Sequence, residues 1–208
     1  MVDVKTAVAV LVIPNLVMDG LQLRRQGPLG DAPRRLAPLL VFTIVGTIVG
    51  TKLLVMLSAR AVTLILGAFV LGFVVLDLAR FAPKISPGRE RLLSAPVGLV
   101  AGVMGGITNA PGTALALYFV ALGMDKREFV RSIAFTFLVV KAVQLATLIW
   151  YGLFGWSLVL MSMGLTAAGL AGFGLGLRLQ DRLDQRAFNR AVLVFLAALG
   201  TWLVVRSL

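Results

Sequence analysis

The chain has 208 residues, 59% of them hydrophobic, and a formal net charge of +11. Since soluble domains are about 45–50% apolar, this composition predicts an all-α, polytopic membrane protein that forms a single membrane domain over residues 1–208. The absence of Cys and His excludes disulfides, thiolate metal sites and Cys or His catalysis. No nucleophile–base pair is apparent, so we expect no enzyme, no cofactor and no metal ion.

The apolar residues fall into runs that approach or exceed the roughly 18 residues needed to span a bilayer. In chain order the runs cover residues 4–23, 36–57, 61–78, 92–124, 129–151 and 156–177, and a last run ends at residue 205. The loops at 24–35, 80–91 and 178–190 are basic, whereas the turn at 152–155 is uncharged. Because basic loops face the cytoplasm, we predict a multi-pass protein of the cell inner membrane.

The positive charge lies in short loops between apolar runs and not on one face of a soluble module. This distribution is typical of topology signals and of contact with anionic lipid, and it argues against a nucleic-acid interface. A second interpretation is that the charge attracts an anionic substrate to the membrane surface. The predicted partners are therefore the lipid bilayer and a small anion, without nucleic acid, and a homo-oligomer is compatible with the sequence.

The run at 92–124 is too long for one helix across a membrane. It carries no formal charge, and as a single helix it would be about 48 Å long in a bilayer core of about 30 Å. Gly and Pro residues interrupt it near the middle, and we predict two half-helices that form a re-entrant pair, entering and leaving on the cytoplasmic side. Irregular backbone at membrane depth persists where it is buried or lines a cavity, and in transporters such breaks mark the substrate site.

Polar groups are expected to converge at this break. Pro111 suits the first position of the second half-helix, and the free N–H groups at a helix N-terminus favour an anion. An alternative role for the glycines is close packing between helices. The predicted anion-binding residues here are Gly105, Gly106, Thr108, Asn109, Pro111, Gly112 and Thr113.

Lys141 lies near the centre of an apolar run, where a charge costs roughly 2.5–3.5 kcal/mol on insertion scales and is usually functional or paired. We expect it either to form a buried ion pair with Asp19 or to be the countercharge of the anion. The alternative is that Asp19 faces the headgroups while Lys141 snorkels. Gln22 and Gln144, one turn further along, are candidate polar liners of the site or helix–helix hydrogen-bonding groups.

An internal repeat relates these positions. Residues 3–23 match residues 125–145 at a shift of 122, and from residue 39 onward the shift becomes 126. The first repeat is placed at 1–81 and the second at 92–208, and the loop charges give them opposite orientations, as in many secondary transporters. The first repeat lacks an opening helix pair equivalent to 92–124, so we expect either that this pair was lost or that the start of the chain is truncated.

The segment GVMGGITNAPGTALALY at 102–118, followed by LGMDKR at 122–127, resembles the sulfite exporter TauE/SafE family of membrane permeases. The resemblance covers the whole chain, except that the family's first Gly-rich segment is absent. It implies transport of sulfur-containing anions such as sulfite or a sulfonate. The positions that match the family's Gly-rich, Pro-containing segment are Gly105, Gly106, Pro111 and Gly112.

Taken together, these features predict a permease that moves small anions across the bacterial inner membrane by alternating access, with the anion held near 108–113. A different class of function stays open: a non-transporting assembly or regulatory protein of the membrane, or a truncated permease.

Overall fold

A computed structural model of the chain describes residues 4–78, 85–109 and 111–182, together with positions 198 and 202. Five segments of this part are long and apolar enough to cross a membrane: Val4–Gln26, Ala32–Met56, Arg89–Thr108, Arg127–Trp150 and Trp156–Gly174. The predicted all-α, polytopic membrane fold is confirmed. The helices are α1 (Val4–Val10), α2 (Val12–Gln26), α3 (Ala32–Met56), α4 (Ala59–Leu78), α5 (Pro87–Thr108), α6 (Gly112–Ala121), α7 (Lys126–Trp150) and α8 (Trp156–Arg182).

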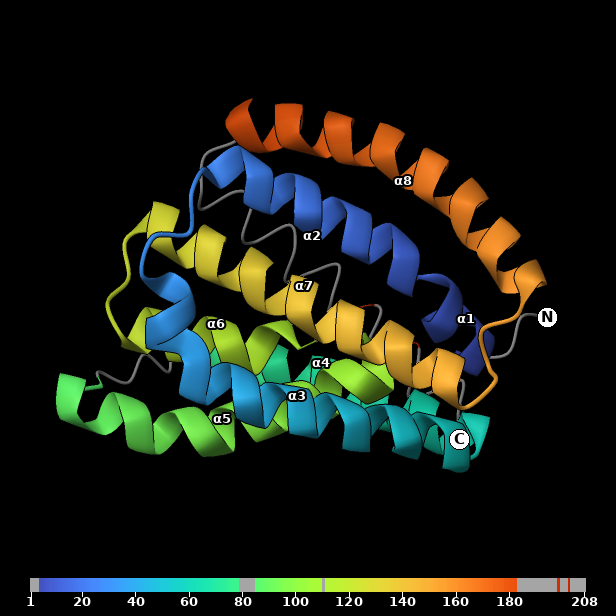
Figure 1. Ribbon diagram of the computed structural model, residues 1–208, viewed down its shortest axis with the longest axis horizontal. Coiled ribbons are helices and arrows are strands. Elements are labelled where there is room, and N and C mark those ends of the chain that lie inside the picture. Colours follow the sequence, from blue (N-terminus) through green and yellow to red (C-terminus); the bar gives the residue numbers. More distant parts are fainter. Residues whose placement is uncertain (1–3, 79–84, 110, 183–197, 199–201, 203–208) are drawn as a thin grey trace.

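The long helices lie side by side, with α8 along α2, α2 along α7, and α7 along α3 (Figure 1). α3 in turn packs closely on α5, and α6 contacts both α5 and α7. Two apolar clusters fill the bundle, one around Val12, Leu54 and Leu148 and the other around Leu39 and Phe119. The broken run of the sequence therefore packs against both α3 and α7.

α3 and α5 approach so closely that their interface requires glycine. A methyl group added at Gly98 would lie 2.5 Å from Leu39 O, and one added at Gly106 would lie 2.6 Å from Thr47 O. These pairings show that the two helices run parallel and in fixed register. The glycines thus serve close helix packing, and backbone atoms of the opposite helix also meet Gly46, Gly50 and Gly102.

The run at 92–124 is interrupted near its middle as predicted, but the break lies next to Pro111 and not at Gly105 and Gly106, which stay within α5. α5 ends at Thr108, Asn109 follows in the left-handed conformation with φ 63°, and α6 begins at Gly112. The two halves are unequal, because α5 takes in the polar residues that precede the apolar run. The 22 residues of α5 reach about 33 Å at about 1.5 Å each, whereas α6 has 10 residues.

α5 and α6 form a helical hairpin. Ile85 N, just before α5, donates a hydrogen bond to Ala121 O at the end of α6, with a distance of 2.9 Å. The start of one helix and the end of the other therefore lie together at one end of the bundle. The re-entrant placement of this hairpin in a bilayer stays a prediction.

A second break, between α1 and α2 at Leu11, was not anticipated from the sequence. Pro14 has no N–H to donate to Val10 O, and its ring crowds that carbonyl. The freed Val10 O instead accepts a hydrogen bond from Ser162 Oγ of α8 at 2.8 Å. Pro14 is the residue in the sequence that indicates this break, but it lies within one long apolar run that is typical of a single helix.

The inverted repeat also stays a prediction. Its matched helices α2 and α7 pack against each other, and they are antiparallel because Gly20 lies near Leu138 while Pro28 O accepts from Arg131. The predicted counterpart of α4 in the second repeat, and most of the loop at 178–190, lie outside the described residues.

Candidate functional site

Lys141 of α7 is the centre of a buried polar network. Its side chain is only 1% exposed, so the alternative in which it snorkels is wrong. Its Nζ donates to Asn109 Oδ1 at 2.7 Å, to Asn109 O at 3.2 Å and to Gln144 Oε1 at 3.2 Å. An ammonium has three protons and no acceptor, so all three donors of Lys141 are used within the protein.

Asn109 and Gln144 extend this network to neighbouring helices. Gln144 Nε2 donates to Gly106 O at 3.0 Å, a carbonyl of the last turn of α5 that has no partner within its own helix. Asn109 Nδ2 donates to Val8 O of α1 at 2.7 Å. The network therefore joins the break between α5 and α6 to α7 on one side and to α1 on the other.

The start of α6 lies beside this network. Pro111 occupies the position before the first helical residue, and no side chain caps the helix. Gly105 is packed tightly, since an added methyl group would lie 3.0 Å from both Pro111 Cβ and Val140 Cγ1. Thus Gly105 and Pro111 shape the turn that presents the N-terminus of α6.

The other predicted residues at the break have different surroundings. An added methyl group at Gly112 would face Phe137 Cζ at 3.1 Å. Thr108 is buried and its hydroxyl donates to Met104 O at 2.7 Å, one turn back in α5. Thr113 lies in the first turn of α6, but its side chain is outside the described part.

Asp19 and Gln22 of α2 lie apart from the hydrogen-bonded network. Lys141 attracts Asp19 through space, but no ion pair joins these two described residues. Asp19 Oδ2 and Gln22 Oε1 are both buried and have no hydrogen-bond partner. The expected buried ion pair is therefore not formed, because Asn109 and Gln144 already take the three protons of Lys141.

Sequence reasoning missed two contributors. The Val8 carbonyl enters the site because the first helix is interrupted next to it, and Pro14 is the local signal for that break. Thr51 of α3 is fully buried with an unpartnered hydroxyl and lies against Gly106 of α5. Its signal is the spacing Thr43, Thr47, Thr51, which puts three hydroxyls on one face of a helix.

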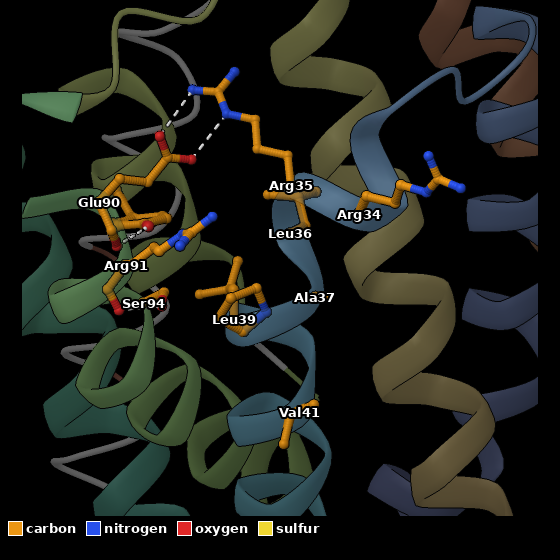
Figure 2. A pocket seen from close by; sticks show the side chains of 11 residues that line it. Arg34, Arg35, Leu36, Ala37, Leu39, Val41, Glu90, Arg91 and Ser94 are labelled. Carbon is orange, nitrogen blue, oxygen red and sulfur yellow. Dashed lines mark hydrogen bonds and ion pairs between the residues drawn. The ribbon is translucent and has the colours of Figure 1, made fainter. Parts of the chain in front are cut away.

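A cavity of about 460 Å³ opens at the end of the bundle where α3, α5 and α7 begin. We call this the basic end, because Arg24, Arg25, Arg34, Arg35, Arg91 and Arg127 gather there. Figure 2 shows Arg91 extending from α5 into the space beside α3, whereas Arg34 points to the other side of α3. Ser94, Tyr118 and Glu90 also line the cavity, so its wall carries basic side chains together with one carboxylate.

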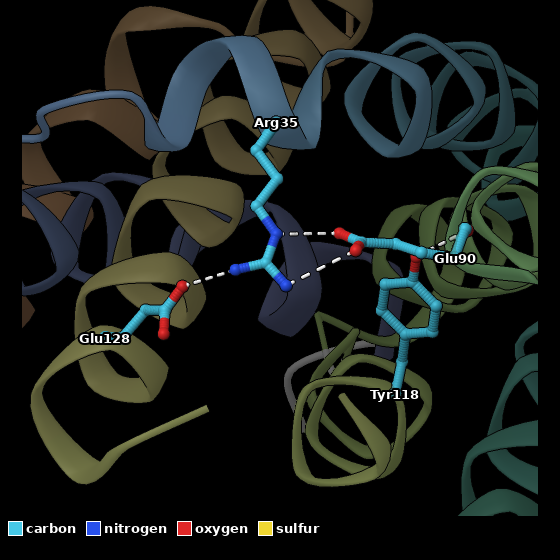
Figure 3. A network of polar contacts seen from close by, with 4 residues as sticks. All are labelled: Arg35, Glu90, Tyr118 and Glu128. Atoms are coloured by element: carbon cyan, nitrogen blue, oxygen red, sulfur yellow. Dashed lines mark hydrogen bonds and ion pairs between the residues drawn. The ribbon is translucent and has the colours of Figure 1, made fainter. Parts of the chain in front are cut away.

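Arg35 closes one side of that cavity by joining three helices. Its Nε donates to Glu90 Oε1 of α5 at 2.8 Å, and its Nη1 donates to Glu128 Oε1 of α7 at 2.7 Å (Figure 3). Tyr118 of α6 adds a fourth helix, because its hydroxyl donates to Glu90 O at 2.8 Å. These residues are separated by 55 and 93 positions in the chain, so no local pattern predicts the cluster.

In the described part of the chain, no group of three or more Asp, Glu, Cys or His side chains is placed to hold a metal ion. The site is instead a buried ammonium among neutral oxygen acceptors, next to the N-terminus of α6, which has no side-chain cap. Both are positive features that favour an anion.

Comparison with known proteins identifies the family of this chain. The family described as sulfite exporter TauE/SafE matches residues 1–203, nearly the whole chain. No curated protein and no solved structure matches it. With five apolar helices of membrane-spanning length among the described residues, the chain belongs to the sulfite exporter TauE/SafE family of membrane transporters.

Proposed function

We propose that this protein is a permease of the cell inner membrane that moves a small sulfur-containing anion, such as sulfite or a sulfonate, by alternating access. The observation that carries the proposal is the buried Lys141 ammonium at the break between α5 and α6. A buried cation in a membrane protein is costly and is by default a functional-site hypothesis. The partners implied are the anion and the surrounding lipid.

Asn109 provides the exchangeable contact. Its Oδ1 and its carbonyl, both neutral acceptors, occupy two of the three proton positions of Lys141. An oxyanion would fill these positions with an acceptor that carries the opposite charge. When the anion binds, Lys141 turns from Asn109 to the anion, and the uncapped N–H groups of α6 complete its coordination. Gln144 keeps the third proton and holds the ammonium in place.

The described arrangement is closed around Lys141. The ammonium is 1% exposed, and Arg35 ties the helices together at the basic end, which the loop charges assign to the cytoplasm. The cavity lined by Arg35 and Arg91 would receive the anion there. Alternating access requires the Arg35 contacts to separate on one side while the opposite end stays closed.

The test is anion flux in vesicles that contain the purified full-length chain. We expect saturable uptake of sulfite or a simple sulfonate, and a loss of roughly tenfold or more in Lys141→Gln, because a lost hydrogen bond to a charged group costs about 1.5–3 kcal/mol. The matched control is Lys52→Gln, which removes an exposed lysine of α3 and should leave flux within about twofold, since an exposed charge away from the site contributes little.

Absence of saturable flux for sulfite, sulfonates and related anions in the wild-type chain would contradict the proposal. It would favour a non-transporting assembly or regulatory protein. Equal flux in wild type and Lys141→Gln would remove Lys141 from the site while leaving transport in place.

A further inference from the structure

Two buried oxygen acceptors on α2 have no donor. Asp19 Oδ2 and Gln22 Oε1 are each shielded from solvent and make no hydrogen bond. They are three residues apart on one helix, so their side chains lie on the same face at about 5–6 Å between Cβ atoms. A buried acceptor without a donor destabilises the fold by about 1–3 kcal/mol, and by more if the group is charged. A ligand that donates to this pair would remove that penalty.

The pair lies where three helices meet. Met18, the residue before Asp19, lies against Gly169 of α8, and Gly20, the residue after it, faces Leu138 of α7. Among described side chains, α7 contributes the one charge that acts on Asp19, Lys141. The described side chains of α8, through Gly174, include no ionisable group.

The two lysines on the helices nearest the pair do not supply the missing donor. Lys141 gives its three protons to Asn109 and Gln144. On α1, the Lys5 ammonium donates to Val55 O at 2.8 Å. Neither Asp19 Oδ2 nor Gln22 Oε1 receives a hydrogen bond from the protein in the described arrangement, which leaves both acceptors open to a ligand.

The chemistry of the pair selects a cation. A carboxylate and an amide oxygen both repel an anion, so these residues are poor ligands for the substrate itself. Hard metal cations such as Ca²⁺ and Mg²⁺ take about six or more oxygen ligands, whereas a proton needs one acceptor to bind and one to share. Two acceptors one helical turn apart fit a proton.

We propose that Asp19 and Gln22 form a proton site that couples proton movement to anion movement. Asp19 takes a proton from water on one side of the membrane, shares it with Gln22 Oε1, and returns it to water on the other side. The inference rests on the proposed anion transport. It adds the proton as the coupled ion and places it at Asp19 and Gln22.

Charge balance gives the direction of coupling. Asp19 and Lys141 together carry no net charge when the carboxyl is ionised, and protonation leaves a net charge of +1 that attracts an anion. Proton and anion therefore favour each other's binding reciprocally and travel in the same direction. For a monovalent anion the loaded site is neutral, so the transport step carries no net charge.

The experiment uses vesicles with the wild-type full-length chain and an imposed pH gradient, with anion uptake and a pH-sensitive dye read together. We expect a gradient of one pH unit to accumulate a monovalent anion about tenfold, since both correspond to about 1.4 kcal/mol. Asp19→Asn should keep anion-for-anion exchange but lose gradient-driven accumulation and proton uptake. Asp31→Asn, in an exposed loop, is the matched control and should behave as wild type.

Three outcomes would overturn the proton site: accumulation unaffected by the pH gradient, gradient-driven accumulation retained in Asp19→Asn, or accumulation driven by a sodium gradient at equal pH. A wild-type chain without flux of any anion would instead contradict the proposed function. A second measurement is independent of flux. Infrared difference spectra between acidic and neutral pH should show a buried protonated carboxyl in wild type and in Asp31→Asn, and its presence in Asp19→Asn would refute the assignment.

Gln22→Leu is the second variant, and it tests proton binding if Asp19→Asn does not fold well enough to be purified. Removal of the acceptor for the shared proton should shift the pH dependence of uptake toward lower pH, because the protonated carboxyl loses its partner. An unchanged pH dependence in this variant would remove Gln22 from the site.

Discussion

Asn109 has three separate structural roles. The backbone is left-handed, with φ 63°, a conformation that Asn tolerates better than most residues. Its Oδ1 accepts from Lys141, and its Nδ2 donates to Val8 O. Gly would satisfy the backbone and lose both side-chain contacts, so Asn is the residue that can end α5 and also hold the buried ammonium.

Asn109→Asp tests whether Asn109 is displaced by the anion. Asp keeps the left-handed backbone, and its carboxylate would form an ion pair with Lys141 in place of the present hydrogen bond to a neutral amide oxygen. We expect anion flux to fall by roughly tenfold or more. The reason is that an added 1.4 kcal/mol in favour of the state in which residue 109 holds Lys141 weakens anion binding by a factor of ten. The measurement is the rate and KM of anion uptake in vesicles.

Asn109→Gly is the matched variant, because it keeps the backbone and removes the competing oxygen of the side chain. It should take up the anion at least as well as wild type but unfold at a lower temperature in detergent. Wild-type uptake by Asn109→Asp would show that the contact between Asn109 and Lys141 persists throughout transport.

At the scale of helices, the position of the break is predictable because its signals are local. Pro111 and Gly112 mark the interruption of an uncharged run between α5 and α6, whereas Gly105 and Gly106 lie within the last turn of α5. The atoms that surround Lys141 are not predictable in this way. Asn109 is 32 residues away along the chain, and it reaches Lys141 through the packing of α5 against α3 and α7.

The expectation of a pair between Asp19 and Lys141 shows the limit of reasoning from repeats. Symmetry placed the two charges in matched helices, and they do attract each other. A repeat does not specify which acceptors reach the ammonium first. Asn109 does so because the helix break frees its side chain and carbonyl to turn toward α7.

Gly106→Ala tests the contact between α3 and α5. The added methyl group would lie 2.6 Å from both Thr47 O and Thr51 N, and these backbone atoms cannot move without separating the helices. Overpacking typically lowers the free energy of unfolding by about 1–3 kcal/mol. We expect a value near the upper end here, because the added methyl group meets the rigid backbone of α3. We expect a lower unfolding temperature in detergent and poor recovery of monodisperse protein.

Gly72→Ala of α4 is the control for that substitution, because an added methyl group there meets nothing within 4 Å. Alanine favours helix over glycine by about 1 kcal/mol, so this variant should be as stable as wild type or more so. Equal stability of the two variants would mean that α3 and α5 can separate freely.

For the whole molecule, the two ends of the bundle differ in kind. At the basic end Arg35 joins α3 to α5 and α7, and Arg91 faces a cavity. At the other end Trp150 and Trp156 are 85% and 74% exposed around an uncharged turn, as aromatic residues are at a membrane interface. This asymmetry supports a cytoplasmic basic end and an opposite end at the outer surface of the membrane.

Thiol labelling of single cysteines tests this orientation and the hairpin together, because the natural chain has no Cys. Ser86→Cys lies before α5, Met124→Cys follows α6, and Ser157→Cys lies in the first turn of α8. We expect a membrane-impermeant maleimide to label Ser157→Cys in intact cells and to label Ser86→Cys and Met124→Cys in inside-out vesicles. The reason is that the α5–α6 hairpin begins and ends at the basic end, where Ile85 N bonds to Ala121 O. Labelling of Ser86→Cys and Met124→Cys from opposite sides would mean that α5 and α6 together cross the membrane, so the break could not form a re-entrant site.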